Sequence, residues 1–414
     1  MNKPVFIVSC PIDTYSGYGA RSRDLVKSII KTDEYDVKIL SQRWGNTRAG
    51  YLKDHNEDIL ASLIIPKVET QPDIWMQITV PNEFQPIGKY NIGCTAGMET
   101  TLIAPQWVEG CNRMNLIITS SEHSKNIIKS TVYDMKSKTS DEVIQKVGVE
   151  KDVEVLFEGV DTSKYFITPS KLNLSAIDEE FCFLTIGHWM QGDVGEDRKN
   201  IGYTIKAFLE TFKNKQNPPA LILKTQQVGS SIMDRNAILD KINDIRNTVK
   251  GKKPNIYLLH GDLTDENINY LYNHPKVKVM LSLTKGEGFG RPLLEFTTTG
   301  KPVMASGWSG QLDFLDKDKS ILVGGNLTKV HNSASVKDMI LQESLWFTPD
   351  PIDVGRKLKE VHKHYKKYLP GSKSQKANTL KNLTLENMDT KLKDILSKYV
   401  PKFPKLVELK LPEL

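Results

Sequence analysis

The chain has 414 residues, of which 39% are hydrophobic and 26% are charged, and its formal net charge at pH 7 is +6. This length argues against a single hydrophobic core and predicts two or three domains of ordinary globular composition. The sequence has no run of about 18 apolar residues and begins directly with a strand-like stretch, so we expect a cytoplasmic protein without a transmembrane segment or a cleavable signal.

Short runs rich in Val, Ile and Leu alternate along the chain with segments of helical periodicity. The runs are PVFIVSC, YDVKIL, IWMQITV and LIITSS in the first half, and FCFLTIG, ALILKT, NIYLLHG, VKVMLSLT and PVMAS in the second half. Alternation of apolar strands with amphipathic helices predicts parallel sheets covered by helices on both faces. The expected fold class is therefore α/β, with two doubly wound, Rossmann-like domains that face each other across a cleft.

Gly, Pro, Ser and charged residues replace the strand and helix patterns near residues 157–180, which indicates a connection between two halves of similar size. We expect an N-terminal domain over residues 1–165, a linker over 166–180 and a C-terminal domain over 181–385. A helix and a proline-containing tail over 386–414 would then pack back on the N-terminal domain. In such folds ligands bind where strands pass into helices, so those loops are the places to search for chemistry.

The first such loop follows the strand at residues 4–10, contains Gly17 and Gly19, and leads into a helix expected from about Ala20. Small residues at this point let a ligand phosphate approach the N–H groups of the helix N-terminus. A dinucleotide fingerprint would need a third glycine or an alanine where Ser22 stands and an acidic residue after the next strand, where Gln42 and Arg43 are found. This disfavours NAD and leaves an NADP- or nucleotide-binding protein without transferase activity as the alternative.

The second loop lies in TKGEGFGRPLLEFTTTGKPVMASG, residues 284–307. Glu287 lies in a glycine-rich turn, Pro292 suits the first helical position, and Glu295 falls in the first helical turn. Two carboxylates in this arrangement can bind two hydroxyl-bearing parts of one ligand, while free N–H groups between them take its phosphate. A sugar nucleotide has that layout. The alternative is that Glu295 only complements its helix dipole and that Glu287 is solvated.

The segment EGFGRPLLE matches the E-x7-E signature of nucleotide-sugar glycosyltransferases of the two-domain GT-B type, and it most closely resembles glycosyltransferase family 4. The resemblance continues in order along the chain. It includes SGYGARSR, PQWVEGCNRMNLIITSSEHSKNII, LFEGVDTSKYF and LTIGHWMQGDVGEDRKNIGYTIKAF. It implies a hexosyl- or pentosyltransferase that moves a sugar from a nucleotide-sugar donor to an acceptor hydroxyl with retention of anomeric configuration.

The resemblance also implies roles for residues of the donor side, which is the C-terminal domain. Glu295 would bind the nucleotide ribose, and Lys199, with Arg198, would neutralise the departing diphosphate. The transferred sugar and the distal phosphate would be held by Glu287 and by the backbone of Gly288, Phe289 and Gly290. From the N-terminal domain, Gly17 and Gly19 would close on the donor.

Two positions depart from the pattern of the family. His188 stands where many members have an arginine, so binding of the diphosphate would depend more on Arg198 and Lys199. No histidine occupies the usual position near the sugar in the N-terminal domain, and Glu99 is our candidate for the residue that faces the acceptor hydroxyl. The alternative is that Glu99 caps a helix starting near Ala104.

The acceptor is undecided at this stage, and the nucleotide base, the sugar and the oligomeric state cannot be read from the sequence. A nucleic-acid acceptor, such as a hydroxymethylated pyrimidine of modified DNA, competes with a polysaccharide or envelope precursor. An extruded base would need an aromatic and positively charged wall, for which Arg43, Trp44 and Arg48 are the candidates. Nine basic residues and one acidic residue between Arg356 and Lys381 could attract phosphate, or could be a solvated helix face.

Neither a metal nor a resident cofactor is expected, because enzymes of the GT-B type stabilise the diphosphate with protein cations and helix ends. The histidines show no metal-binding spacing, and the single D-x-D, Asp316 to Asp318, lies in a lysine-flanked turn. The four cysteines are far apart and form no C-x-x-C pair, so we expect buried free thiols at Cys10, Cys94, Cys111 and Cys182.

Overall fold

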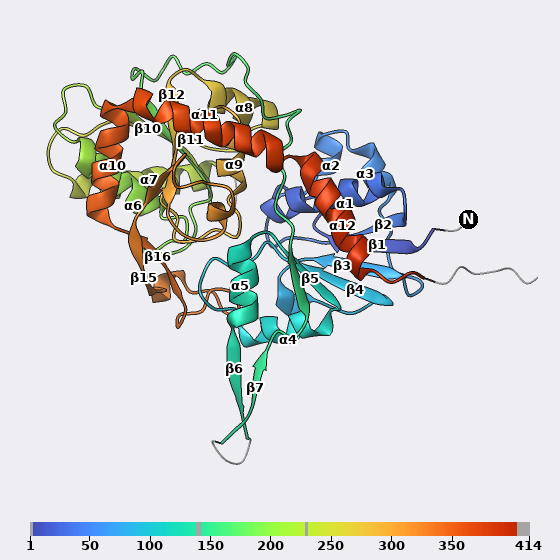
Figure 1. Cartoon of the computed structure of the whole chain (residues 1–414). Helices are drawn as coiled ribbons and strands as arrows, with labels where there is room; N and C mark the ends of the chain where they lie inside the picture. Colours follow the sequence, from blue (N-terminus) through green and yellow to red (C-terminus); the bar gives the residue numbers. More distant parts are fainter. Residues whose placement is uncertain (1–2, 138–141, 228–230, 404–414) are drawn as a thin grey trace, which may run out of the picture.

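The computed structural model of the chain describes residues 3–137, 142–227 and 231–403. These residues include two six-stranded sheets in which every pair of neighbouring strands is parallel, one in each half of the molecule (Figure 1). The expected α/β class and doubly wound architecture are confirmed.

The N-terminal sheet has the order β2-β1-β3-β4-β5-β8. Its strands are β1 (Val5–Cys10), β2 (Asp36–Ser41), β3 (Ile74–Ile78), β4 (Tyr90–Cys94), β5 (Leu116–Thr119) and β8 (Asp152–Val155). The chain reverses its direction of travel across the sheet between β1 and β3, which in such folds opens a crevice at the carboxyl ends of the strands. The helices are α1 (Gly17–Thr32), the short α2 (Tyr51–Asp54) and α3 (Asp58–Ser62), α4 (Pro105–Arg113) and α5 (Glu122–Ser130).

The C-terminal sheet repeats this arrangement with the order β11-β10-β9-β12-β13-β14. Its strands are β9 (Cys182–Ile186), β10 (Ala220–Lys224), β11 (Ile256–Leu259), β12 (Val277–Ser282), β13 (Val303–Ser306) and β14 (Ile321–Val323). The helices around it are α6 (Ile201–Phe212), α7 (Ile232–Thr248), α8 (Asp265–Asn273), α9 (Arg291–Thr297) and α10 (Pro351–Lys363). Burial on both faces explains why these strands read as continuous apolar runs.

Two antiparallel hairpins and three short 3-10 helices add to the sheets. The hairpin of β6 (Val132–Lys136) and β7 (Val143–Gly148) projects from the N-terminal domain (Figure 1), and β15 (Gly325–Lys329) pairs with β16 (Leu345–Pro349) beside the C-terminal sheet. The 3-10 helices are η1 (Pro81–Glu83), η2 (Gly310–Asp313) and η3 (Asn332–Ala334). Leu345 of β16 exchanges hydrogen bonds with Thr101, so this hairpin also contacts the N-terminal domain.

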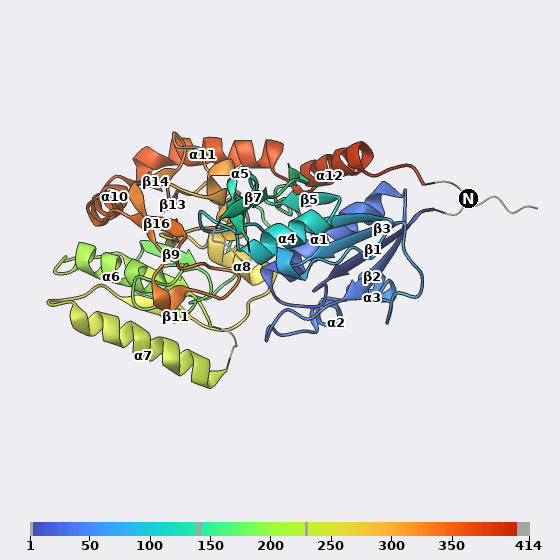
Figure 2. The same ribbon diagram turned by 90° about the horizontal axis from the view of Figure 1, so that it is seen from below.

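The chain crosses between the domains twice. The first crossing runs from β8 to β9, and the second connects α11 (Tyr365–Asn382) to α12 (Leu385–Tyr399), which lie along one side of both domains (Figure 2). The crossings touch, because the Val160 N–H donates to the Leu383 carbonyl at 2.8 Å and the Leu385 N–H donates to the Val160 carbonyl at 3.0 Å.

Helix α12 belongs to the core of the N-terminal domain. Its apolar face joins the same buried cluster as α1, and the α12 residues in that cluster are Met388, Leu392, Ile395 and Leu396. Residues 404–414 of the expected tail lie outside the described residues. Within the described part of the chain, no helix has both the length and the apolar character needed to span a membrane.

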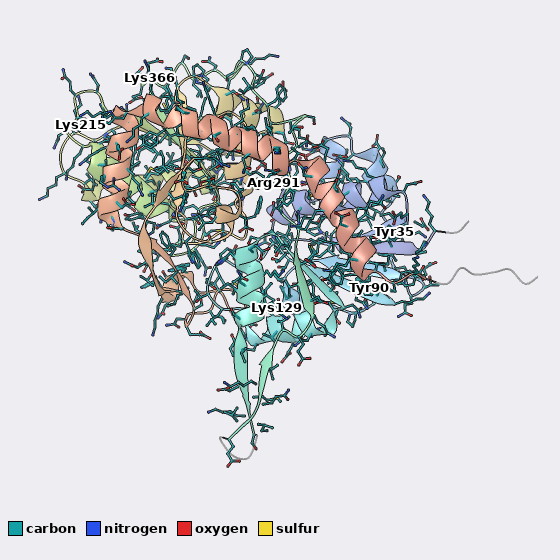
Figure 3. All side chains as sticks on the ribbon, viewed as in Figure 1. Tyr35, Tyr90, Lys129, Lys215, Arg291 and Lys366 are labelled. Carbon is teal, nitrogen blue, oxygen red and sulfur yellow. The ribbon has the colours of Figure 1, made fainter. Side chains whose placement is uncertain are left out.

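The cysteines, the start of α1 and the basic segment 356–381 were also predicted from the sequence. All four cysteines are buried free thiols, as expected. Helix α1 begins at Gly17 rather than near Ala20, because the Ser16 side chain accepts from the Gly19 N–H at 2.9 Å and caps the helix three residues earlier. The lysines of the segment 356–381 are mostly exposed, and Lys366 and Lys215 lie on the side of the C-terminal domain away from α12 (Figure 3).

Candidate active site

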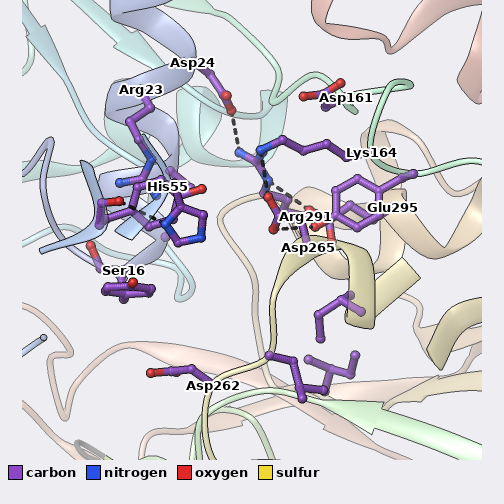
Figure 4. A pocket seen from close by; sticks show the side chains of 18 of the residues that line it. Ser16, Arg23, Asp24, His55, Asp161, Lys164, Asp262, Asp265, Arg291 and Glu295 are labelled. Atoms are coloured by element: carbon purple, nitrogen blue, oxygen red, sulfur yellow. Dashed lines mark hydrogen bonds and ion pairs between the residues drawn. The ribbon is translucent and has the colours of Figure 1, made fainter. Parts of the chain in front are cut away.

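A cavity of about 310 Å³ lies between the two domains (Figure 4). The C-terminal domain contributes the loops that follow β9, β10 and β11 together with α9, and the N-terminal domain contributes the loop after β1, α1 and the region of α2. The residues that line this cavity include Ser16, Gly17, Asp24, His188, Thr225, Gln226, Arg291 and Glu295. The cavity therefore lies at the strand ends where ligands of doubly wound folds bind.

Glu295 lies on the wall of this cavity from the first turns of α9. The side chain is almost fully buried, and it accepts hydrogen bonds from Arg291 Nε at 3.0 Å and from the Tyr272 hydroxyl at 3.2 Å. Burial raises the pKa of the Glu295 carboxyl to about 7, although Arg291 opposes this shift. A carboxylate held in this way keeps acceptor capacity for hydroxyl groups of a ligand.

Arg291, the first residue of α9, connects Glu295 to the other domain. Its guanidinium donates to Asp24 Oδ2 of α1 at 2.6 Å, and Glu158 Oε2 lies 3.9 Å away (Figure 4). Burial alone would lower the pKa of Arg291, but Asp24, Glu295 and Glu158 together raise it well above its ordinary value. One largely buried cation thus orients the cavity carboxylate and joins α1 to α9.

Glu287 takes part in a separate ion-pair cluster. Lys199 Nζ lies 2.6 Å from Glu287 Oε1, and Arg198 lies 3.5 Å from Glu287 Oε2 and 3.4 Å from Glu99 Oε1. Burial would raise the pKa of the Glu287 carboxyl, but Lys199 and Arg198 lower it below its ordinary value, so the carboxyl is ionised at neutral pH. The four side chains are absent from the wall of the first cavity.

The ion-pair cluster nevertheless adjoins that cavity. A Cβ added to Gly187, which lines the cavity, would lie 3.6 Å from Lys199 Cδ. Glu99 belongs to this cluster and does not cap α4, because Ala104 is the N-cap of that helix and no side chain bonds there.

The glycines after Lys285 allow the two domains to meet. A Cβ at Gly286 would lie 2.0 Å from the Glu99 carbonyl oxygen, and a Cβ at Gly288 would lie 2.2 Å from the Ala96 carbonyl oxygen. The Ser120 hydroxyl lies 2.5 Å from the Ala96 carbonyl oxygen and 3.1 Å from the Gly288 carbonyl oxygen at the same contact. At this loop the backbones of the two domains are therefore in close contact.

Phe289 and Gly290 complete this loop in different ways. Phe289 is buried against Phe314, with ring centroids 5.0 Å apart, so its side chain belongs to the core. Gly290 is the N-cap of α9 with φ +99°, a backbone conformation that residues other than glycine rarely adopt.

Gly17 and Gly19 of the first loop have different structural roles. Gly17 lines the cavity, and an added Cβ there would meet no atom within 4 Å. At Gly19 the added Cβ would lie 2.3 Å from the Thr14 carbonyl oxygen. Gly17 therefore leaves room at the cavity, while Gly19 lets α1 pack against its own loop.

His188, Thr225 and Gln226 line the side of the cavity formed by the C-terminal domain. His188 Nδ1 lies 2.9 Å from the Gln227 carbonyl, and burial lowers the pKa of this imidazole, which favours its neutral form. Thr225 Oγ1 and Gln226 Oε1 are buried and have no hydrogen-bond partner among the described residues. Both residues line the cavity, so these buried atoms can bind a polar ligand once their side chains turn toward it.

The acceptor-side candidates are divided between two places. Arg43 and Trp44 line a second cavity, of about 420 Å³, in the N-terminal domain. Arg48 lines neither cavity, because its guanidinium lies 2.5 Å from Asp54 and 3.8 Å from Asp262 across the domain boundary. The structure thus brings Arg43 and Trp44 together and places Arg48 in a contact between the domains.

Sequence reasoning missed Arg291, Asp24, Thr225 and Gln226. Arg291 could have been found as a charged residue at the start of an otherwise apolar helix. Thr225 and Gln226 could have been found as the polar residues at and directly after the end of the apolar run ALILKT. Asp24 gave no signal, because its partner is 267 positions away. Among the described residues, no cluster of three or more His, Cys, Asp or Glu side chains could hold a metal ion.

No family model matches this sequence, and no curated protein sequence matches it either. Solved structures do match the fold. A glycosyltransferase from Rickettsia africae aligns with a TM-score of 0.64 at 12% identity, covering 96% of this chain and 99% of its own. Sucrose-phosphate synthase from Thermosynechococcus elongatus aligns with a TM-score of 0.63 at 10% identity and the same coverage, 96% and 99%.

A third match is HepE from Anabaena, solved in complex with UDP and glucose. It has a TM-score of 0.60 at 12% identity, covering 95% of this chain and 99% of its own. Identity this low shows the fold alone. The chain has the GT-B fold of two Rossmann-like domains, and the resemblance of its E-x7-E segment to glycosyltransferase family 4 remains an interpretation of the sequence.

Proposed function

We propose that the protein is a nucleotide-sugar-dependent glycosyltransferase that transfers a hexosyl or pentosyl group to an acceptor hydroxyl with retention of anomeric configuration. The observation that carries this proposal is the cavity between the domains, where buried Glu295 and the ends of β9, β10 and β11 face the Gly17 loop. A cleft of this kind suits a ligand with a base, a ribose and a diphosphate in sequence.

A uridine nucleotide is the donor that the comparisons favour. HepE structures contain UDP or UDP-glucose, and an Escherichia coli trehalose-6-phosphate protein with a TM-score of 0.59 at 11% identity is bound to UDP-2-fluoro glucose. In this chain the unpartnered Thr225 Oγ1 and Gln226 Oε1 would bind the base, and Glu295 would accept hydrogen bonds from the ribose hydroxyls.

Lys199 and Arg198 are the proposed cations for the leaving diphosphate. Both side chains are ion-paired with Glu287, so a bound diphosphate would take over part of this pairing and leave Glu287 to bind a sugar hydroxyl. As the bond from the anomeric carbon to the diphosphate breaks, the cations neutralise the charge that develops on the phosphate. For retention, the acceptor oxygen bonds to the same face of the sugar and its proton passes to the departing phosphate.

The alternative of an NADP-binding protein is not favoured by the arrangement of the loops. In a dinucleotide site the residue at the end of the second strand faces the same ligand as the glycine loop. Here Arg43 lines the second cavity, whereas Gly17 lines the first.

The test is a binding screen of the full chain by thermal shift and calorimetry. UDP-, GDP- and ADP-sugars are compared with and without magnesium, with NADP as the control ligand. We expect one sugar nucleotide to stabilise the protein without magnesium and Glu295→Ala to weaken its binding by roughly tenfold or more. Glu266→Gln, a carboxylate change outside both cavities, is the matched control. Stabilisation by NADP alone would reject the proposal.

A further inference from the structure

The second cavity lies on the other side of the Gly17 loop from the first. It has a volume of about 420 Å³ and is lined by the loop after β1, the end of β2 and the turn after β2, including Asp13, Thr14, Arg43, Trp44 and Asn46. Thr14 lines this cavity and Ser16 lines the first, and their hydroxyl oxygens are 2.8 Å apart. The walls of the two cavities therefore adjoin at this hydrogen-bonded pair of side chains.

Trp44 provides an aromatic surface on the second cavity. Its ring stacks on Tyr18 with centroids 4.0 Å apart and an angle of 22° between the planes. The Tyr18 hydroxyl is in turn within 3.0 Å of Thr95 Oγ1 and accepts from the Ala96 N–H at 3.1 Å. The Ala96 carbonyl in turn lies against Gly288 at the domain contact. Trp44 is therefore connected to the glycine loop after Glu287 through the Tyr18 ring and the backbone at Ala96.

Arg43 brings an uncompensated positive charge to the same cavity. Its guanidinium has no hydrogen bond or ion pair among residues 3–137, 142–227 and 231–403, whereas Arg48 is paired with Asp54. The backbone N–H groups of Gly45 and Asn46 also find no acceptor within the described chain. A guanidinium beside free N–H groups of a turn favours an anion.

The single carboxylate on this cavity, Asp13, is hydrogen-bonded to backbone N–H groups. Asp13 Oδ2 accepts from the Gly50 N–H at 3.0 Å, and Asp13 Oδ1 accepts from the Leu52 N–H at 2.8 Å. Both oxygens are thus engaged in holding the segment that leads into α2. Arg43 is the one cation among the residues that line this cavity.

We propose that the second cavity is the acceptor site and that the acceptor is a hydroxylated ring carrying a phosphate group. The ring lies on Trp44 and the phosphate binds Arg43 and the turn at Gly45 and Asn46. One aromatic ring, Trp44, and one cation, Arg43, line this cavity and suit one ring with one phosphate, so a free sugar phosphate is the expected source of this chemistry. This inference rests on the proposed function and gives the acceptor a chemical class.

The transfer step is balanced without a further reactant. The acceptor oxygen forms a bond to the anomeric carbon of the donor sugar while the bond from that carbon to the diphosphate oxygen breaks. The hydroxyl proton passes to the departing phosphate oxygen, and the nucleoside diphosphate leaves. The donor in the first cavity and the acceptor in the adjoining second cavity are bound at the same time, so that the acceptor hydroxyl meets the anomeric carbon where the cavities adjoin.

The experiment is calorimetric titration of the full chain, first with UDP and UDP-glucose and then, at saturating UDP, with acceptor probes. The probes are hexose 6-phosphates, the corresponding hexoses and a single-stranded oligonucleotide containing hydroxymethylcytosine. We expect a hexose phosphate to bind at least about tenfold more tightly than its hexose, and Arg43→Ala to remove that difference. Lys53→Ala, an exposed cation of α2 outside both cavities, is the matched control.

Trp44→Phe retains an aromatic ring and should keep most of the affinity, whereas Trp44→Ala should weaken the hexose and its phosphate by a similar factor. Melting curves of each variant separate loss of binding from loss of the fold. Equal affinity for hexose and hexose phosphate, or no change in Arg43→Ala, would overturn the inference. Tightest binding of the oligonucleotide would also overturn it and assign the cavity to a nucleic acid.

The donor titration distinguishes the two proposals. If the wild-type chain binds neither UDP nor UDP-glucose but still binds hexose phosphates through Arg43, the proposed transferase function fails while the second cavity keeps its ligand class. If UDP competes with the hexose phosphate, the two ligands share one site and the assignment of a separate acceptor cavity is wrong.

Discussion

The guanidinium of Arg291 in α9 lies 2.6 Å from the carboxylate of Asp24 in α1, so one ion pair joins the two domains beside the first cavity. Both side chains are largely buried, and such pairs resist removal of one partner because the other is left uncompensated. We expect Asp24→Asn and Arg291→Gln each to lower the free energy of unfolding, with a coupling of roughly 0.5 to 3 kcal/mol in a double-mutant cycle followed by urea unfolding.

The ion pair of Lys31 and Asp389 is the matched control for this cycle. It also joins helices distant in sequence, α1 and α12, at 2.6 Å, but the lysine side chain is 58% exposed. A more exposed pair should show a coupling of about 0 to 1 kcal/mol. Equal couplings for the two pairs would contradict the role assigned to Arg291.

Donor binding should depend on pH through Glu295. Burial raises the pKa of this carboxyl from 4.5 to about 7, so the ionised form that accepts hydrogen bonds from ribose is lost as the pH falls below about 7. We expect the dissociation constant of the sugar nucleotide to rise in that range, and Glu295→Gln to bind weakly at every pH. Calorimetry between pH 5.5 and 8.5 measures this effect, and a dependence retained in Glu295→Gln would assign it to another group.

The same shift has a consequence for stability with the opposite sign. The folded protein holds the Glu295 proton more tightly than the unfolded chain, so between pH 4.5 and about 7 this group lowers the free energy of unfolding as the pH rises. Glu295→Gln removes this contribution. As the pH rises from 4.5 to about 7, the wild type should therefore lose unfolding free energy relative to Glu295→Gln.

Gly17 and Gly19 should respond differently to alanine. Gly17→Ala places a methyl group in open space on the cavity wall, so we expect unchanged stability and weaker donor binding. Gly19→Ala places it 2.3 Å from the Thr14 carbonyl, a clash that should destabilise the protein by about 1 to 3 kcal/mol. Thermal unfolding and donor titration of both variants measure the contrast. Equal melting temperatures of the Gly17→Ala and Gly19→Ala variants would contradict the clash with the Thr14 carbonyl.

Gly288→Ala should separate the domains. The new Cβ would lie 2.2 Å from the Ala96 carbonyl, a backbone atom that cannot rotate away, so the contact between the loop after β12 and the N-terminal domain must open. We expect an increased radius of gyration in small-angle scattering and loss of transferase turnover, while circular dichroism stays at the wild-type level. Gly17→Ala serves as the control for a glycine change that leaves the domain contact intact. An unchanged radius of gyration would contradict this account.

Much of the fold follows from local sequence. The continuous apolar runs predicted nine of the sheet strands, because buried parallel strands need no alternation of polar and apolar residues. β4 was missed, since its segment is interrupted by Gly93, where a Cβ would lie 2.4 Å from the Phe84 ring. The hairpin of β15 and β16 was missed because Trp346 and its neighbours form their own small core, which no local period indicates.

The site was predicted only in part. The sequence placed Glu295 and Gly17 near strand ends, and the structure finds both on one cavity. Sequence could not show that Glu287 is paired with Lys199, because 88 residues separate the two and their distance depends on packing between β9 and β12. The division of Arg43 and Arg48 between a cavity and a domain contact likewise depends on how the turn after β2 folds back.

The return of α12 to the first half of the molecule bears on the order of synthesis. The buried face of α1 is completed by Leu392 and Ile395, which leave the ribosome more than 350 residues after α1. The C-terminal sheet, whose strands end at Val323, can form first as a contiguous unit. The N-terminal half therefore matures last during translation, although it is made first, and a fragment that stops before α12 would present an apolar surface to chaperones.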